Sequence, residues 1–166
     1  HTENDSSISG ATRFQKLVFI GQQEQDKIPE VYSYHADKFG PFSPELHGDL
    51  NQLHEIGLIE KNTVTNEVGN ERFDYGLTDE GIQKARGLLK HDKLDPVFDT
   101  VQMVKKEWNN KPLPEVLQYV YHNYQEYTTE SELDLEQLFD PDTRSQFLKE
   151  DREFAGSEPG EWKKMN

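Results

Sequence analysis

Residues 39–60 contain a turn, a helix start and a helix stop in close succession, and they constrain the fold more than any other part of the chain. The run Phe39-Gly40-Pro41-Phe42 predicts a turn, because proline fixes φ and glycine adopts conformations that other residues resist. Ser43 is a good N-cap and Pro44 a good first helical residue. Gly57 fits a left-handed C-terminal cap. The sequence therefore predicts a short capped helix that leads into a strand.

The residues after this helix predict a two-stranded hairpin and a second helix. Strand-like runs cover 58–65 and 73–77, separated by a polar tip at residues 66–70. Thr78 can cap the following helix, expected over 79–90 with Ile82, Ala85, Leu88 and Leu89 inward. Helix, hairpin and helix in this order are the skeleton of a winged helix.

The flanking segments extend this skeleton into an α+β chain. Apolar spacing predicts a helix over 12–23, β propensity predicts a strand over 31–35, and stripes after Pro96 and Pro114 predict further helices. A last short helix is expected over 131–139. The expected organisation is a disordered tail at 1–10, a winged helix-turn-helix domain at 11–90, a C-terminal helical extension at 91–140 and a mobile acidic tail at 141–166. The extension should pack on the domain or form a dimer interface.

Composition limits the classes of function. The net charge is -14, with the acid concentrated after residue 90, and this counts against ordinary DNA binding, which depends on lysine and arginine at phosphates. A salt-loving host, in which acidic surfaces are normal, would weaken that objection. The chain has no cysteine and no window apolar enough to cross a membrane. We expect a soluble cytoplasmic protein without a membrane partner.

The capped helix carries the candidate binding residues. Leu46, Leu50 and Leu53 form its predicted buried stripe, and the opposite face is polar but has no lysine or arginine. In a DNA-binding winged helix this face would enter the major groove, with the wing near phosphates. A solvated polar face is the alternative. The candidate contacts are Ser43, His47, Gly48, Asn51 and Gln52 on the helix and Lys61, Asn62 and Arg72 on the hairpin.

No catalytic or metal-binding pattern accompanies these residues. His47 and His54 are about two helical turns apart, too far to share one metal without further ligands. The sequence has no phosphate-binding loop, dinucleotide-binding glycine run or nucleophile elbow. We therefore expect no enzymatic activity, no cofactor and no metal.

Three segments carry a resemblance to a known family: Thr12–Ile20, Tyr34–Leu46 and Leu53–Ile59. They resemble the YwgA-like proteins, which share a Lys-Leu helix, a Gly-Pro-Phe/Tyr-Ser turn and a Gly-Leu-Ile helix exit, and which look related to the Panacea, or SocA-like, antitoxin domain. The resemblance covers roughly residues 11–90. It implies a winged-helix-like fold and a regulatory or antitoxin-associated role without known catalysis. The acidic face of the capped helix departs from a typical DNA-reading version.

Two hypotheses of function follow. The first is a non-enzymatic transcriptional regulator or antitoxin-like protein that binds duplex DNA, with a homodimer through residues 97–127 supplying two half-site readers. The second is an interaction module whose acidic helix and wing bind a basic protein. The aromatic residues between 108 and 127 are expected in a core or dimer interface more than in a ligand cage.

Overall fold

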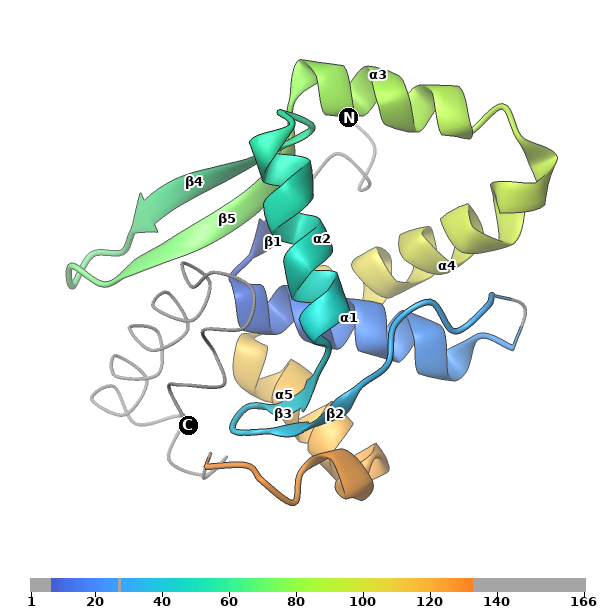
Figure 1. The fold of residues 1–166 in the computed structure, drawn as a ribbon. Helices are drawn as coiled ribbons and strands as arrows, with labels where there is room; N and C mark the ends of the chain where they lie inside the picture. Colours follow the sequence, from blue (N-terminus) through green and yellow to red (C-terminus); the bar gives the residue numbers. More distant parts are fainter. Residues whose placement is uncertain (1–6, 27, 133–166) are drawn as a thin grey trace.

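The computed structural model describes residues 7–26 and 28–132 and has a mixed α+β fold (Figure 1). The helices are α1 (Ala11–Glu24), α2 (Pro44–Glu55), α3 (Asp79–Leu88), α4 (Asp95–Val104) and α5 (Leu113–Asn123), with short helical turns η2 (Asp92–Leu94), η3 (Lys105–Asn109) and η4 (Gln125–Tyr127). The strands are β1 (Ile8–Ser9), β2 (His35–Asp37), β3 (Gly40–Phe42), β4 (Ile59–Thr65) and β5 (Glu71–Leu77). They form an antiparallel sheet in the order β1-β5-β4 and a separate β2–β3 hairpin.

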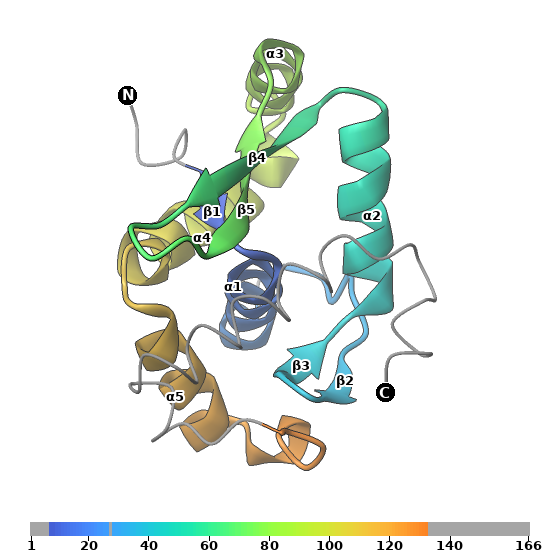
Figure 2. The same ribbon diagram turned by 90° about the vertical axis from the view of Figure 1, so that its left-hand side faces the viewer.

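α1 is the centre of the molecule. Figure 2 looks along this helix and shows α2, the β2–β3 hairpin, α4, α5 and the sheet arranged around it. Ten of its residues are buried, including four with charged or amide side chains. The apolar spacing that predicted a helix over 12–23 is thus confirmed, but the burial extends well beyond the apolar stripe.

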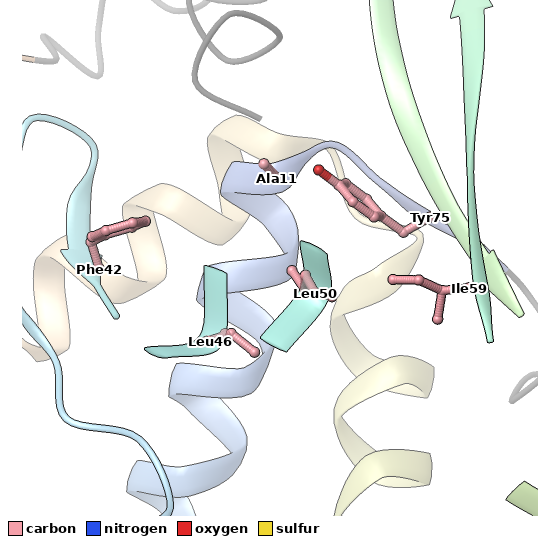
Figure 3. Packing of buried hydrophobic residues seen from close by; sticks show 6 residues of the cluster. All are labelled: Ala11, Phe42, Leu46, Leu50, Ile59 and Tyr75. Atoms are coloured by element: carbon pink, nitrogen blue, oxygen red, sulfur yellow. The ribbon is translucent and has the colours of Figure 1, made fainter. Parts of the chain in front are cut away.

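Two hydrophobic clusters meet on α1. In the first, Leu46 and Leu50 of α2 pack with Phe42, Ile59 and Tyr75, and α1 contributes the buried Ala11 (Figure 3) together with the partly buried Phe14 and Val18. In the second, Leu17, Phe19 and Ile20 of α1 pack with Val104 of α4 and with Val116 and Val120 of α5. Because α1 contributes to both clusters, the helices after residue 90 share a core with the elements before it.

The partly buried tyrosines of α5, of η4 and of the residue between them pack against this second cluster. The Phe19 ring lies edge-on to the rings of Tyr34, Tyr124 and Tyr127, each at a centroid distance of 5.0 Å. Edge-to-face pairs at such distances are favourable. These aromatic side chains therefore stabilise the chain's own core.

The turn before α2 belongs to the β2–β3 hairpin, which the sequence did not predict. The strand expected over 31–35 is wrong in position, because β2 begins only at His35. Val31 and Tyr32 pair with none of the strands that the structure describes, and their amides instead donate to Oε1 of Gln22 at 3.1 and 3.0 Å. Gly40 has φ +83°, and a Cβ there would lie 2.8 Å from the Tyr121 ring, so glycine is required at this position.

β4 and β5 form the predicted second hairpin, in register from Ile59 opposite Leu77 to Thr65 opposite Glu71. The side-chain oxygen of Asn66 accepts from the amides of Val68 and Asn70, which organises the polar tip. The hairpin is therefore confirmed, with β5 two residues longer at its start than expected.

α3 makes few contacts with the other elements that the structure describes. Its N-terminus is fixed by Thr78, whose hydroxyl accepts from the Gly81 amide at 3.0 Å, and a Cβ at Gly81 would lie 1.9 Å from the Leu58 carbonyl oxygen. Beyond this turn the helix leaves the sheet and lies apart from α1 (Figures 1 and 2). The expectation that Leu88 and Leu89 point inward is wrong, because both are exposed and none of the elements in the described part of the chain covers them.

The beginning of the described chain also corrects an expectation. Ile8 and Ser9 form β1 on β5, and Gly10 donates to the Phe73 carbonyl at 2.8 Å, so the tail predicted over 1–10 does not include these residues. α2 is preceded by the β2–β3 hairpin and not by a second helix, which differs from the predicted helix-turn-helix. The helix predicted over 131–139 and the tail predicted over 141–166 lie almost wholly outside the described residues.

Candidate functional site

α2 and the β4–β5 hairpin, here called the α2–hairpin surface, carry all the predicted binding residues. The helix is fixed at both ends as its sequence predicts. The Ser43 hydroxyl accepts from the Leu46 amide at 3.3 Å, and Pro44 occupies the first turn. At the other end Gly57 has φ +77°, and the amides of Gly57 and Leu58 donate to His54 and Leu53 carbonyls. These two bonds define a Schellman motif.

Ser43 is a structural residue in this arrangement. Its exposed fraction is 0%, its hydroxyl donates to Glu45 Oε2 at 3.0 Å, and its backbone amide and carbonyl both bond the Gln15 side chain. The prediction that Ser43 contacts a partner from the outer face is therefore wrong, because the cap and the neighbouring helix enclose it.

His47 also lies inside and not on the outer face. It is 3% exposed, and its ring packs 6.1 Å from that of Phe42. The buried face of α2 holds Leu46, His47 and Leu50, while Leu53 is 36% exposed. The predicted stripe is thus rotated toward His47, because Phe42 of the β2–β3 hairpin packs against that side and, among the described residues, the last turn of α2 stays exposed.

Asn51 joins the helix to the hairpin. Its side-chain oxygen accepts from Lys61 Nζ at 2.8 Å, and its amide nitrogen lies 3.4 Å from His47 Nε2. The Lys61 ammonium also lies 5.9 Å from the centre of the Tyr75 ring. Both candidates are half-buried and held by contacts within the chain.

Asn62 and Arg72, the other hairpin candidates, are also bonded within the chain. The Asn62 amide donates to Glu60 Oε1 at 2.9 Å. Arg72 Nε donates to Asp74 Oδ1 at 2.8 Å, and Nη2 lies 3.4 Å from the other carboxylate oxygen. The positive charge of Arg72 is therefore offset on the same strand, since every second residue of a strand faces the same side.

Gly48 and Gln52 remain on the outward side of α2, as predicted. A Cβ at Gly48 would meet no atom within 4 Å, and Gln52 is exposed. The acids Glu55 and Asp49 are exposed beside them, and Ile56 just after the helix is 58% exposed. The outward face thus combines negative charge with apolar side chains.

Tyr32 connects the loop before β2 to this face. Its hydroxyl donates to Asp49 Oδ2 at 2.8 Å. Burial, and to a smaller extent the Asp49 carboxylate, raise the pKa of Tyr32 to about 12. The phenol therefore stays neutral and keeps donating at any physiological pH.

Sequence reasoning missed the polar residues of α1 that hold the turn before α2. Gln15 bonds both backbone groups of Ser43 at 3.0 Å, and Lys16 Nζ donates to the Pro41 carbonyl at 2.9 Å. Both side chains are buried. A signal was present, because the Lys-Leu helix and the Gly-Pro-Phe-Ser turn are two of the three motifs of the family resemblance, and here they contact each other.

The described residues contain no group of three or more histidine, aspartate and glutamate side chains placed to hold a metal. His54 Nδ1 lies 3.1 Å from the Ile59 carbonyl oxygen, while His47 is buried beside Phe42. The two histidines therefore serve separate local contacts.

No family model, curated protein or solved structure matches the chain. In the part that the structure describes, none of the helices has the length and apolar character needed to cross a membrane.

Proposed function

We propose that α2, the β4–β5 hairpin and α3 form a winged helix, and that the protein is a non-enzymatic regulator or antitoxin-like interaction module. The order helix, hairpin, helix supports this proposal, as does β1, which adds a third strand to the hairpin. The resemblance of residues 11–90 to the YwgA-like proteins supports the regulatory or antitoxin-like role. The α2–hairpin surface is then the binding face.

The charge of this surface indicates what kind of partner it binds. α2 contains no lysine or arginine, and its exposed charged side chains are Glu45, Asp49 and Glu55. The two basic candidates on the hairpin, Lys61 and Arg72, are bonded to Asn51 and Asp74. Acidic surfaces steer basic partners and repel phosphates. We infer that the partner is a basic protein.

Exposed apolar side chains on the same elements support a protein partner. Leu53 and Ile56 are exposed at the end of α2, and Val64 and Val68 are exposed on the hairpin and its tip. Burial of exposed aliphatic side chains under a protein partner is favourable, because it removes apolar surface from water.

Site-specific photo-crosslinking in the native host tests this proposal. A photoreactive amino acid replaces Gln52 in the full chain, and a matched variant carries it at Gln118, which is exposed on α5. We expect position 52 to give a discrete adduct that protease digests, nuclease does not, and position 118 does not give. Equal adducts from both positions, or none from position 52, would remove the proposal.

Duplex DNA is the second candidate partner. The observation in its favour is that Gln52 and Asn62 are exposed on the helix and the hairpin, as in a winged helix that reads the major groove. A nuclease-sensitive adduct from position 52 would select this candidate over the basic protein.

A further inference from the structure

α3 has an apolar face that continues beyond its contact with the β4–β5 hairpin. Apolar residues at the spacing of one side of a helix form this face: Ile82, Ala85, Leu88 and Leu89. Its first turn is close to the hairpin, since a Cβ at Gly81 would collide with the Leu58 carbonyl oxygen. Its last turn is open, because Leu88 and Leu89 are 48% and 51% exposed. Leu77, whose side chain lies beside Gly81, extends the open patch and is 40% exposed.

The helix that carries this patch stands away from the centre of the fold. Figures 1 and 2 show α3 apart from α1 and from the β2–β3 hairpin. Among the elements that the structure describes, its contacts are mainly with β5. Covering the open leucines would remove apolar surface from water, which is favourable. The patch is therefore suited to contact another macromolecule.

The two ends of α3 carry opposite charges. Asp79 and Glu80 lie in its first turn, whereas Arg86 lies in its last turn and Lys90 just after it. All four side chains are exposed, and the salt bridges among the described residues do not involve them. This distribution stabilises the helix through its dipole. It also makes the surface of the helix complementary to itself, because an apolar face runs between a negative and a positive end.

We propose that α3 packs against α3 of a second copy of the chain in an antiparallel arrangement. Two copies related by a two-fold axis use the same patch, so that patch must be self-complementary. Antiparallel packing places Asp79 and Glu80 of one copy beside Arg86 and Lys90 of the other, whereas parallel packing would bring like charges together. The contact differs from the dimer interface predicted from the sequence over residues 97–127. It is also separate from the binding role proposed for the α2–hairpin surface, and either can fail without the other.

Sedimentation velocity of the full chain over a range of concentrations tests the proposal. We expect a weak equilibrium of monomer and dimer, because the contact is one short helix and the net charge of -14 repels a second copy. Leu88→Gln removes an apolar contact from both copies at once and should weaken association at least about tenfold. Val68→Gln, at an exposed valine of the hairpin tip, should leave it unchanged. A chain that stays monomeric up to about 1 mM, or equal weakening by both variants, would overturn the proposal.

Charge reversal tests the antiparallel arrangement. One variant carries Asp79→Lys with Glu80→Lys, and the other carries Arg86→Glu with Lys90→Glu. Each variant alone should stay monomeric, because both ends of its helix then carry the same charge. An equimolar mixture should form a heterodimer, since each positive end then meets a negative end. Circular dichroism checks that both variants are folded. Association of either folded variant with itself as strong as that of the original chain, or no association in the mixture, would overturn the arrangement.

Discussion

Polar residues have opposite roles on α1 and α2. On α1, Arg13, Gln15, Lys16 and Gln22 are buried, and each donates to a backbone carbonyl of another segment. On α2 the acids and Gln52 face solvent. Buried polar groups must be hydrogen-bonded, so those of α1 determine where neighbouring segments lie. The comparison shows that a polar side chain indicates a binding face only when its helix leaves that side uncovered.

Replacement of one glutamine on each helix tests this contrast most strongly. Gln15→Ala leaves the buried Ser43 amide without its partner, which costs about 1–3 kcal/mol, whereas the Ser43 carbonyl still accepts from the His47 amide. With the second lost hydrogen bond, we expect the free energy of unfolding, measured in denaturant, to fall by about 2–4 kcal/mol. Gln52→Ala should change it by about 0.5 kcal/mol or less. Similar losses in both variants would contradict the assigned roles.

Replacement of Asn51 should have an effect on stability between those of the two glutamine variants. Asn51→Ala removes the acceptor of Lys61 and the contact to His47, and in this half-buried position the cost should be about 1 kcal/mol. Asn62→Ala provides a control, because its bond to Glu60 is exposed and its loss should be close to zero. Thermal melts of both variants measure the difference. A larger loss for Asn62→Ala would show that the hairpin depends on its surface contacts.

Gly48→Ala should stabilise the protein, because alanine is the better helix former and its Cβ would meet no atom. The expected gain in the free energy of unfolding is about 0.5–1 kcal/mol. A larger side chain, as in Gly48→Gln, should leave stability intact but prevent the crosslink from position 52 if a partner approaches the helix closely. Destabilisation by Gly48→Ala would mean that α2 is not a regular helix at this position.

The smallest expected effect is a decrease in the stability of the fold at alkaline pH. The folded pKa of Tyr32 is raised to about 12 from its usual 10, so the folded state holds this proton more tightly than the unfolded state. The resulting stability is complete below pH 10 and is lost as the pH rises from 10 toward 12. Because Tyr32 is half-exposed, the contribution is modest. In thermal melts between pH 10 and pH 12, Tyr32→Phe should lose less stability than the original chain. An equal loss in both proteins would show that other tyrosines cause the pH dependence.

What the sequence predicted correctly depends on local signals. The caps of α2 at Ser43 and Gly57 and the β4–β5 hairpin follow from residues close to one another in the chain. The face that α2 buries does not, because it is set by the residues that pack on Leu46 and Leu50, and Ala11 of α1 and Tyr75 of β5 come from distant parts of the sequence. The strand misplaced to residues 31–35 has the same cause, since Gln22 takes the place of a partner strand.

The surroundings of the candidate residues could be predicted only in part. These residues were expected to face a partner from the capped helix and the hairpin, yet Ser43 and His47 are enclosed and Lys61 is bonded to Asn51. α3 shows the same limit, because its periodicity predicted an apolar face at Leu88 and Leu89 but could not tell whether any element covers it. Burial is a property of the assembled fold.

The central claim is that the α2–hairpin surface binds a basic protein and not DNA. A titration of fluorescently labelled duplex DNA with the protein, followed by anisotropy, tests it most directly. At about 50 mM salt, where contacts to phosphate are strongest, we expect no binding. The same absence is expected in multimolar KCl, where an acidic DNA-binding protein from a salt-loving host would still bind. Saturable binding under either condition that is weakened by Gln52→Ala would contradict the account.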